Sequence, residues 1–107
     1  MGEREHQLKT WPEPFEAMLD GRKTFEFRFD DRAFMVEDIL TCREWDPAKG
    51  PALAPTGRWL RAKVTYVLHG GRFGLPVGYV VLGVRRISDG FAETGWPPFL
   101  TVEERAA

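Results

Sequence analysis

Three charged residues in the N-terminal third of the chain, Lys23, Glu26 and Arg28, have the types and spacing to bind a ligand or to do chemistry. From Thr24 onward polar and aromatic residues alternate, a period of two that is typical of a half-buried strand. The alternation places Thr24, Glu26 and Arg28 on one face of the strand, with Lys23 just before it. Neighbouring cations favour the ionised form of a carboxyl group. The sequence therefore predicts a permanently charged cluster suited to a polar, partly anionic ligand.

The same residues allow an enzymatic interpretation. A lysine can act as a base or a nucleophile, and a nearby glutamate can transfer a proton. Lys23 and Glu26 are therefore the candidate catalytic residues if the protein is an enzyme. A third interpretation is a solvated strand face without a function, because an exposed ion pair contributes only about 0 to 1 kcal/mol to stability. The spacing of the residues alone does not decide among these three interpretations.

A helix is predicted immediately before the cluster, from about Pro12 to Asp20. Thr10 is the candidate N-cap, and Gly21 is expected to end the helix because glycine adopts positive φ without steric cost. The apolar residues of this segment recur at the spacing of one helix face and are expected to pack in the core. They are Trp11, Phe15, Met18 and Leu19.

The aromatic residues of the strand, Phe25, Phe27 and Phe29, are expected to face the same core. Because strand residues alternate between two faces, the charged residues must then point the other way. The charged face is either solvated or the wall of a polar cleft. Asp31 and Arg32 follow in a predicted turn and add further charge beside the cluster.

Four other segments have strand patterns: His6–Thr10, Ile39–Trp45, Arg58–Leu68 and Tyr79–Val84. In the third, Arg61, Lys63 and Thr65 lie opposite the apolar residues and form a candidate basic stripe. The fourth is almost continuously apolar, which is typical of a strand buried on both faces, and residues 85–87 are expected to end it.

The connections between these segments are rich in glycine and proline. Residues 46–57 are expected to form an exposed loop without structure of its own. Residues 69–78 lack the Gly-Lys-Ser/Thr ending and the following helix of a phosphate-binding loop, so they are predicted to be a hairpin loop. Residues 88–107 are predicted to be an irregular arm that packs its aromatic residues onto the sheet, followed by a frayed tail.

Composition limits the classes of function. Lys and Arg number 15 against 16 Asp and Glu, a formal net charge of −1, so any nucleic-acid site must be a local patch. With one cysteine, Cys42, and two histidines, His6 and His69, neither an internal disulfide nor a zinc site nor another cofactor is expected. No run approaches 18 apolar residues, and the charged start lacks the apolar stretch of a signal peptide. A cytoplasmic protein without membrane contact is expected.

Four or five strands, one N-terminal helix and no internal repeat predict a single α+β domain, mainly β, over residues 1–107. A small β-barrel or a strongly curved sheet is expected, because closure hides strand edges. The core is expected over about residues 6–87, with residues 88–107 as a C-terminal arm. The oligomeric state stays open between a monomer and a weak dimer.

Several short motifs follow one another in a fixed order: Leu8-Lys9, Trp11-Pro12, Gly21-x-Lys23-x-x-Glu26-x-Arg28, Asp31-Arg32-x-Phe34, Asp38-Ile39-Leu40, Arg43-Glu44-Trp45-Asp46, Val64-Thr65-Tyr66 and Phe73-Gly74-Leu75. Over about residues 6–87 this order resembles the DUF3850 family of the ASCH and PUA-like superfamily. The Gly-x-Lys-x-x-Glu-x-Arg element is the best-known signature of that superfamily.

The resemblance implies a PUA-like β-barrel with an N-terminal helix beside a cleft, and a partner that is RNA or a nucleotide-like small ligand. In ASCH domains the signature lysine and acid line that cleft, and here they are Lys23 and Glu26, with Arg28 as a second cation. Cations and the acid would contact phosphates and base edges, and Trp11 or Tyr79 would stack on a base. The full expected set is Lys9, Trp11, Lys23, Thr24, Glu26, Arg28, Asp31, Arg32 and Tyr79.

Some ASCH relatives are similar to ribonucleases or to small amidohydrolases that act on acylated nucleosides, with the signature lysine central. The amidohydrolases use a hydroxyl residue where this chain has Glu26, and Thr24 is only a weak substitute for it. Two further departures concern charge. Glu37 stands where the family usually has glycine, and Asp30 stands where asparagine is common. Both add negative charge near the cleft and weaken its expected attraction for phosphate.

Overall fold

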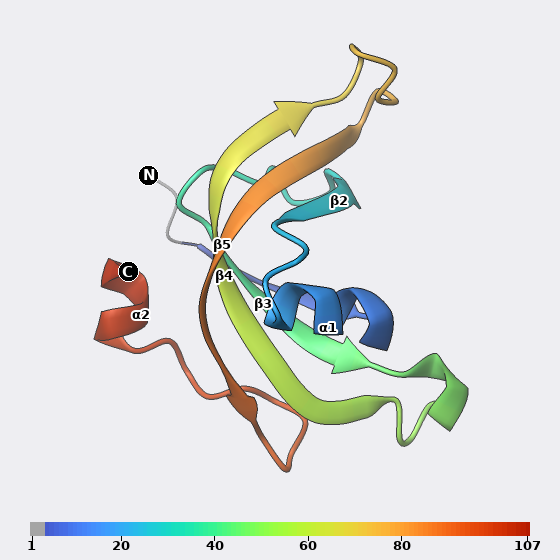
Figure 1. Cartoon of the computed structure of the whole chain (residues 1–107), viewed down its shortest axis with the longest axis vertical. Coiled ribbons are helices and arrows are strands. Elements are labelled where there is room, and N and C mark those ends of the chain that lie inside the picture. The colour runs from blue at the N-terminus through green and yellow to red at the C-terminus, as the bar shows by residue number, and fades with distance from the viewer. Residues whose placement is uncertain (1–3) are drawn as a thin grey trace.

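Five strands form one strongly curved sheet in the computed structural model of this chain, which describes residues 4–107 (Figure 1). Along the chain the strands are β1 (Glu5–Thr10), β2 (Phe25–Phe29), β3 (Ile39–Trp45), β4 (Pro55–His69) and β5 (Tyr79–Phe91). In space their order is β1-β3-β4-β5-β2, with β1 and β3 parallel and the other neighbours antiparallel. β1 and β2 are therefore the two edges. The predicted mainly β, barrel-like fold with an N-terminal helix is confirmed.

The two edges are joined by arginine side chains. Arg28 of β2 donates a hydrogen bond to the carbonyl oxygen of Lys9 at 2.8 Å. Arg32, just beyond β2, donates to the carbonyl oxygen of Gln7, also at 2.8 Å. Both carbonyls belong to β1, and an unpaired strand edge leaves such acceptors without a partner. The guanidinium groups therefore satisfy part of the open edge and join the two ends of the sheet.

Helix α1 (Pro12–Leu19) follows β1 directly. Its N-cap is Trp11, so the prediction of Thr10 at that position is wrong. Thr10 is instead the buried last residue of β1, because the pairing of β1 with β3 extends to this position. Gly21 has a φ of +88° and follows the end of the helix as predicted.

The apolar core lies between α1 and the sheet. Strand residues that point inward alternate with residues that point outward, and the inward set contacts the buried face of α1. Its members come from α1, from the segment between β2 and β3, and from every strand except β2: Leu8, Phe15, Met18, Phe34, Leu40, Cys42, Leu60, Ala62, Val64, Val80, Leu82 and Val84.

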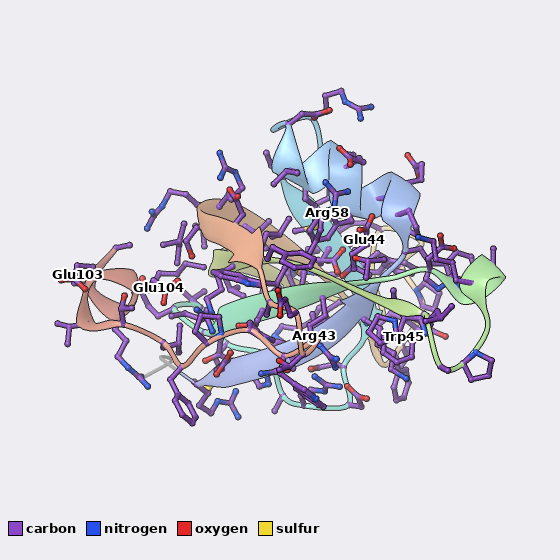
Figure 2. The ribbon with its side chains drawn as sticks, turned by 90° about the horizontal axis from the view of Figure 1, so that it is seen from below. Arg43, Glu44, Trp45, Arg58, Glu103 and Glu104 are labelled. Carbon is purple, nitrogen blue, oxygen red and sulfur yellow. The ribbon has the colours of Figure 1, made fainter. Side chains whose placement is uncertain are left out.

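A charged bridge fixes α1 on the sheet. Arg58 of β4 donates to Glu44 of β3 at 2.9 Å and also pairs with Glu16 of α1. Figure 2 shows Arg58 and Glu44 close together beneath the helix. The hydrogen bond from Arg58 lowers the pKa of Glu44, and its bonds to Glu44 and Glu16 raise the pKa of Arg58. The bridge therefore stays charged and has a structural role.

Strand β2 has the predicted alternation but the opposite orientation. Phe25, Phe27 and Phe29 are 48%, 51% and 56% exposed, whereas Glu26 is 5% exposed. The prediction that the aromatic face packs in the core is therefore wrong. Glu26 can point inward because its charge is paired with two cations, and a buried carboxylate is tolerated only when it is paired in this way.

The candidate basic stripe on β4 is not a surface. Arg61 and Lys63 are 1% and 4% exposed. The C-terminal helix α2 (Val102–Ala106) covers them: Arg61 donates to Glu104 at 3.0 Å, and Lys63 donates to the carbonyl oxygen of Arg105 at 3.0 Å. The prediction of an exposed basic stripe is wrong because a segment distant in sequence covers this face.

Strand β5 and the loop before β4 also differ from expectation. β5 continues to Phe91 rather than ending at residues 85–87, and only one of its faces is buried, through Val80, Leu82 and Val84. Residues 46–57 are not without structure, because they contain a short 3₁₀ helix (η1, Pro47–Lys49) and the first residues of β4. The predicted hairpin over residues 69–78 is confirmed by the antiparallel pairing of β4 with β5.

The C-terminal arm ends in a capped helix rather than a frayed tail. Thr101 and Glu104 form a reciprocal capping box at the start of α2. The expected aromatic packing is only partly present: Trp96 lies over Arg43, with 3.9 Å between the guanidinium carbon and the ring centroid, but Phe99 is 97% exposed. Within residues 4–107, neither helix has the length and apolar character needed to span a membrane.

Candidate ligand-binding cleft

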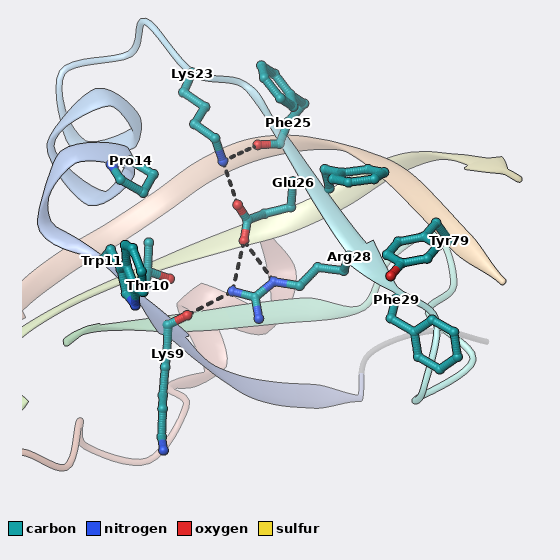
Figure 3. Close-up of a pocket in the computed structure, with 11 residues that line it drawn as sticks. Lys9, Thr10, Trp11, Pro14, Lys23, Phe25, Glu26, Arg28, Phe29 and Tyr79 are labelled. Atoms are coloured by element: carbon teal, nitrogen blue, oxygen red, sulfur yellow. Dashed lines mark hydrogen bonds and ion pairs between the residues drawn. The ribbon is translucent and has the colours of Figure 1, made fainter. Parts of the chain in front are cut away.

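A cleft of about 410 Å³ runs along the free edge of β2, facing the end of β1 and the start of α1 (Figure 3). Because β2 is an edge strand, residues from both of its faces reach the cleft. The lining residues are Lys9, Thr10, Trp11, Pro14, Lys23, Phe25, Glu26, Phe27, Arg28, Phe29 and Tyr79. The cleft therefore combines ionic groups with aromatic ones.

Glu26 is the centre of the ionic part. Lys23 Nζ donates to Glu26 Oε1 and, at 2.8 Å, to the carbonyl oxygen of Phe25. Arg28 Nε donates to Glu26 Oε2 at 3.2 Å, so each carboxylate oxygen has a cationic partner. Glu26 is buried, whereas Lys23 and Arg28 are partly exposed to the cleft. We call these three residues the ionic array; its two cations and one anion leave a net positive charge.

The turn after α1 holds Lys23 in this position. The left-handed conformation of Gly21 reverses the chain, and the backbone N–H of Lys23 then donates to the carbonyl oxygen of Ala17 at 2.9 Å. One residue later, the carbonyl oxygen of Thr24 accepts from the N–H of Val84 at 3.0 Å, next to where β2 begins to pair with β5. Lys23 is thus fixed between the end of the helix and the start of the strand.

Four aromatic side chains form one wall of the cleft, which we call the aromatic wall: Phe25, Phe27, Phe29 and Tyr79. Phe27 stacks on Tyr79 with ring centroids 5.3 Å apart and an angle of 16° between the rings. Phe29 contacts Tyr79 edge to face, at 77°. Such pairs hold aromatic rings in defined orientations. About half the surface of each phenylalanine is nevertheless open to solvent.

The opposite side of the cleft is formed by the end of β1 and the start of α1. Trp11 is exposed at this rim and faces the ionic array across the cleft (Figure 3). The side chain of Lys9 extends away from the array, and its ammonium lies 4.2 Å from the centroid of the Trp45 ring. Lys9 contributes to the array mainly through its backbone carbonyl, which accepts from Arg28.

Cys42 lies in the core behind the ionic array. Burial, together with the negative charge of Glu26, raises the pKa of the Cys42 thiol to about 12. A protonated thiol is neither a nucleophile nor a good metal ligand at neutral pH. Within residues 4–107 no group of three or more His, Cys, Asp or Glu side chains is placed to hold a metal ion.

The chain is similar to a known family in sequence and to a solved structure in fold. Residues 5–84 match the family described as a domain of unknown function, DUF3850, and this match spans most of the chain. The chain belongs to the DUF3850 family. No curated protein matches it.

The fold of this DUF3850 chain is similar to the crystal structure of a mutant of ZmASCH from Zymomonas mobilis, with a TM-score of 0.56. The two proteins are 16% identical, and the likeness covers 96% of this chain and 94% of that one. At this level of identity the likeness shows the fold alone. It confirms that the DUF3850 chain has an ASCH-type fold.

Most of the ligand-binding residues nominated from the sequence line the cleft of this DUF3850 domain. Three lie elsewhere. Thr24 lines a second cleft and is not among the residues that line the first. Arg32 is held by the backbone of β1, and Asp31 is exposed, 3.6 Å from Arg32. The residues that the structure brings together are Lys9, Trp11, Lys23, Glu26, Arg28 and Tyr79.

Five residues that line the cleft are not among those nominated from the sequence: the three phenylalanines of β2 and two residues near the start of α1, Thr10 and Pro14. The alternation of Phe25, Phe27 and Phe29 is visible in the sequence, but it predicts a face packed in the core. An aromatic strand face has the same sequence pattern whether it packs in a core or lines an open cleft. The position of β2 at the sheet edge is the missing information.

Proposed function

We propose that the cleft binds a nucleobase-bearing ligand and that this domain is a binding module for single-stranded RNA or for a modified nucleotide. One observation carries the proposal: a half-exposed aromatic wall and a charged array line the same cleft. Bases in single-stranded RNA are recognised by stacking on aromatic rings and by hydrogen bonds to their polar edges. The cleft offers both kinds of contact.

The aromatic wall supports stacking because its rings are already ordered by their mutual contacts. Phe27 and Phe29 both contact Tyr79, so little side-chain freedom remains to be lost on binding. A stacked base contributes about 1–3 kcal/mol to the binding of single strands. Trp11 on the opposite rim provides a further exposed ring.

The ionic array supports recognition of polar groups. Glu26 accepts hydrogen bonds from Lys23 and Arg28, and a carboxylate can accept further bonds, for example from an exocyclic amino group. Among the contacts described within residues 4–107, Arg28 uses Nε and Nη2, and its Nη1 remains a donor for a ligand. Because the chain as a whole has a net charge of −1, we expect modest affinity and a shallow dependence on salt.

A hydrolase is the alternative that the same residues allow, with Lys23 and Glu26 as catalytic groups. The geometry gives it less support. Lys23 Nζ donates to Glu26 and to a backbone carbonyl, so both contacts engage the nitrogen that would have to attack a substrate. Thr24, the candidate hydroxyl residue of the amidohydrolase interpretation, lines the second cleft and not the first.

The test is fluorescence anisotropy with 5′-fluorescein-labelled hexaadenylate RNA at low and moderate salt. We expect saturable binding that Phe27→Ala weakens about tenfold through the loss of one stacking contact, and that Lys23→Ala also weakens. Phe99→Ala is the matched control, because Phe99 is an exposed phenylalanine on the C-terminal arm outside the cleft. The RNA is run on a gel afterwards.

Absence of binding by the wild-type protein would refute RNA binding at this cleft. Equal weakening by Phe27→Ala and Phe99→Ala would show that the aromatic wall is not the binding surface. Cut RNA that depends on Lys23 would make the domain a nuclease and overturn the assignment as a binding module.

A further inference from the structure

A second cleft of about 240 Å³ lies on the other side of Lys23. It is lined by Met18, Gly21, Lys23, Thr24, Ala62, Val84, Arg85 and Arg86. Lys23 lines both clefts, so the two are separated only by the turn that leads from α1 into β2. A ligand that extends beyond one nucleotide unit and leaves the first cleft at Lys23 would enter the second.

We infer that the second cleft binds the phosphodiester that follows the base held in the first cleft, so that the ligand is a strand at least two nucleotides long. The inference rests on the function proposed above and narrows it from any nucleotide to a single-stranded oligonucleotide. It assigns the phosphate contact to Arg85 and Arg86, which lie outside the signature element of the family.

The composition of the second cleft fits a sugar-phosphate unit. Its apolar part comes from Met18, Ala62 and Val84, and the charged side chains that line it in the described part of the chain are all cations. Thr24 adds a hydroxyl group at the same surface. Among residues 4–107 no acidic side chain lines this cleft, in contrast to the first, where Glu26 offsets part of the positive charge. An apolar surface beside cations suits a ribose next to a phosphate.

Of the three cations that line the second cleft, Arg85 is the one most available to a phosphate. Arg86 is paired with Asp89 at 2.8 Å, and Lys23 is bound to Glu26. Arg85 is exposed, and within residues 4–107 it takes part in no salt bridge. A guanidinium group with free N–H groups can bind a phosphate through two parallel hydrogen bonds.

The backbone holds Arg85 next to the turn that separates the clefts. Val84, the residue before Arg85, donates its N–H to the carbonyl oxygen of Thr24 at 3.0 Å. Gly83 is the pairing partner of Phe25, so the start of β2 and this part of β5 are fixed in register. The position of Arg85 relative to Lys23 therefore does not depend on a mobile loop.

The test compares Arg85→Ala with Arg72→Ala in the anisotropy assay with labelled hexaadenylate, over a series of salt concentrations. Arg72 is an exposed arginine in the 69–78 hairpin loop, lines neither cleft, and its substitution changes the net charge equally. We expect Arg85→Ala to weaken binding several-fold at low salt and to reduce the slope of log K against log salt by about 0.7, the value for one lost phosphate contact on a single strand. Arg72→Ala should change neither.

Competition with short unlabelled ligands gives a second measurement. On the wild-type protein, the dinucleoside monophosphate ApA should displace the labelled RNA at lower concentration than adenosine does, because only ApA carries the bridging phosphate. On Arg85→Ala this advantage should disappear, while adenosine should compete as before.

The outcomes separate this inference from the function on which it rests. If hexaadenylate binds and Phe27→Ala weakens it, but Arg85→Ala behaves like Arg72→Ala, the second cleft is not a phosphate site and the proposed function stands. If the wild-type protein does not bind hexaadenylate, both proposals fail. If Arg85→Ala lowers affinity and salt slope together, the second cleft is part of the binding surface.

Discussion

Two clusters of charge on the same sheet differ in what covers them. The ionic array of Lys23, Glu26 and Arg28 opens into a cleft at the free edge of β2. The cluster around Arg61 in the middle of β4 is sealed: Arg61 donates to Glu104 at 3.0 Å and to Thr41 Oγ1 at 3.1 Å. In the sequence both clusters have the alternating pattern of a charged strand face. Only the first is accessible to a ligand.

The difference is whether another segment of the chain folds over the cluster. α2 seals Arg61 and brings the carboxylate of Glu104 to it, with Ser88 donating a further hydrogen bond to that carboxylate. Within residues 4–107 no strand pairs with the free edge of β2, so the array there remains open. Sealed charges of this kind contribute to the structure, whereas open ones can exchange their contacts with water for contacts with a ligand. The comparison predicts that substitutions in the sealed cluster affect stability and those in the open array affect binding.

The largest expected effect is that of Arg61→Ala. Removing one partner of a buried ion pair costs about 3–5 kcal/mol, because the other charge loses its compensation. We expect a loss of about 3 kcal/mol in the free energy of unfolding, since the arm can partly detach and hydrate Glu104. Lys23→Ala should cost about 1 kcal/mol or less, because Glu26 keeps Arg28 as a partner and the cleft admits water. Urea denaturation of both variants measures the two losses in the free energy of unfolding. Equal losses would contradict the distinction between a sealed and an open cluster.

A smaller effect is expected from pH. Burial alone would raise the pKa of Glu104, but hydrogen bonds from Ser88, Thr101 and Arg61 outweigh it and hold the pKa below its usual value of 4.5. Because the pKa is lower in the folded state, ionised Glu104 stabilises the fold above about pH 4.5, and this stabilisation is lost as the pH falls further.

The melting temperature between pH 7 and pH 3 measures this loss. Glu104→Gln should be less stable than the wild type at pH 7, and the difference should narrow toward pH 3. Parallel curves for the two proteins would mean that the sealed cluster does not depend on the charge of Glu104.

The exposed position of the aromatic wall gives a third test. A phenylalanine truncated in a core costs about 3–5 kcal/mol, but Phe27 is half exposed and its main contact is the stacked ring of Tyr79. Phe27→Ala should therefore lower the free energy of unfolding by only about 1 kcal/mol, while weakening RNA binding. If urea denaturation showed a loss of about 3–5 kcal/mol in the free energy of unfolding, as for a core residue, the phenylalanines would have to be buried.

The smallest effect is expected at the turn before β3. Glu37 has a φ of +80°, the left-handed region that a non-glycine residue adopts at a cost of about 1–2 kcal/mol. Glu37→Gly should relieve this cost, partly offset by the greater flexibility of glycine in the unfolded chain, and raise the free energy of unfolding by about 0.5 kcal/mol. Urea denaturation with no change, or with a decrease, would show that the 3.7 Å contact of Glu37 with Lys63 outweighs the strain.

Much of the architecture could be predicted from local patterns. The helix after β1, the glycine that follows it, β3 and the hairpin between β4 and β5 were placed correctly, because spacing and turn residues act over a few neighbours. The ionic array was also identified, since Lys23, Glu26 and Arg28 are close in sequence and one turn and one strand suffice to bring them together. The N-cap at Trp11 instead of Thr10 is an error of one residue, set by how far β1 pairs with β3.

The sequence by itself determined which residues of β2 and β4 share a face, because side chains alternate on any strand. It did not determine which face is covered. That was decided by the position of β2 at the sheet edge, which left Phe25, Phe27 and Phe29 half exposed, and by α2, which folded back over Arg61. Burial depends on segments that are distant in sequence, and a local pattern contains no information about where they come to lie.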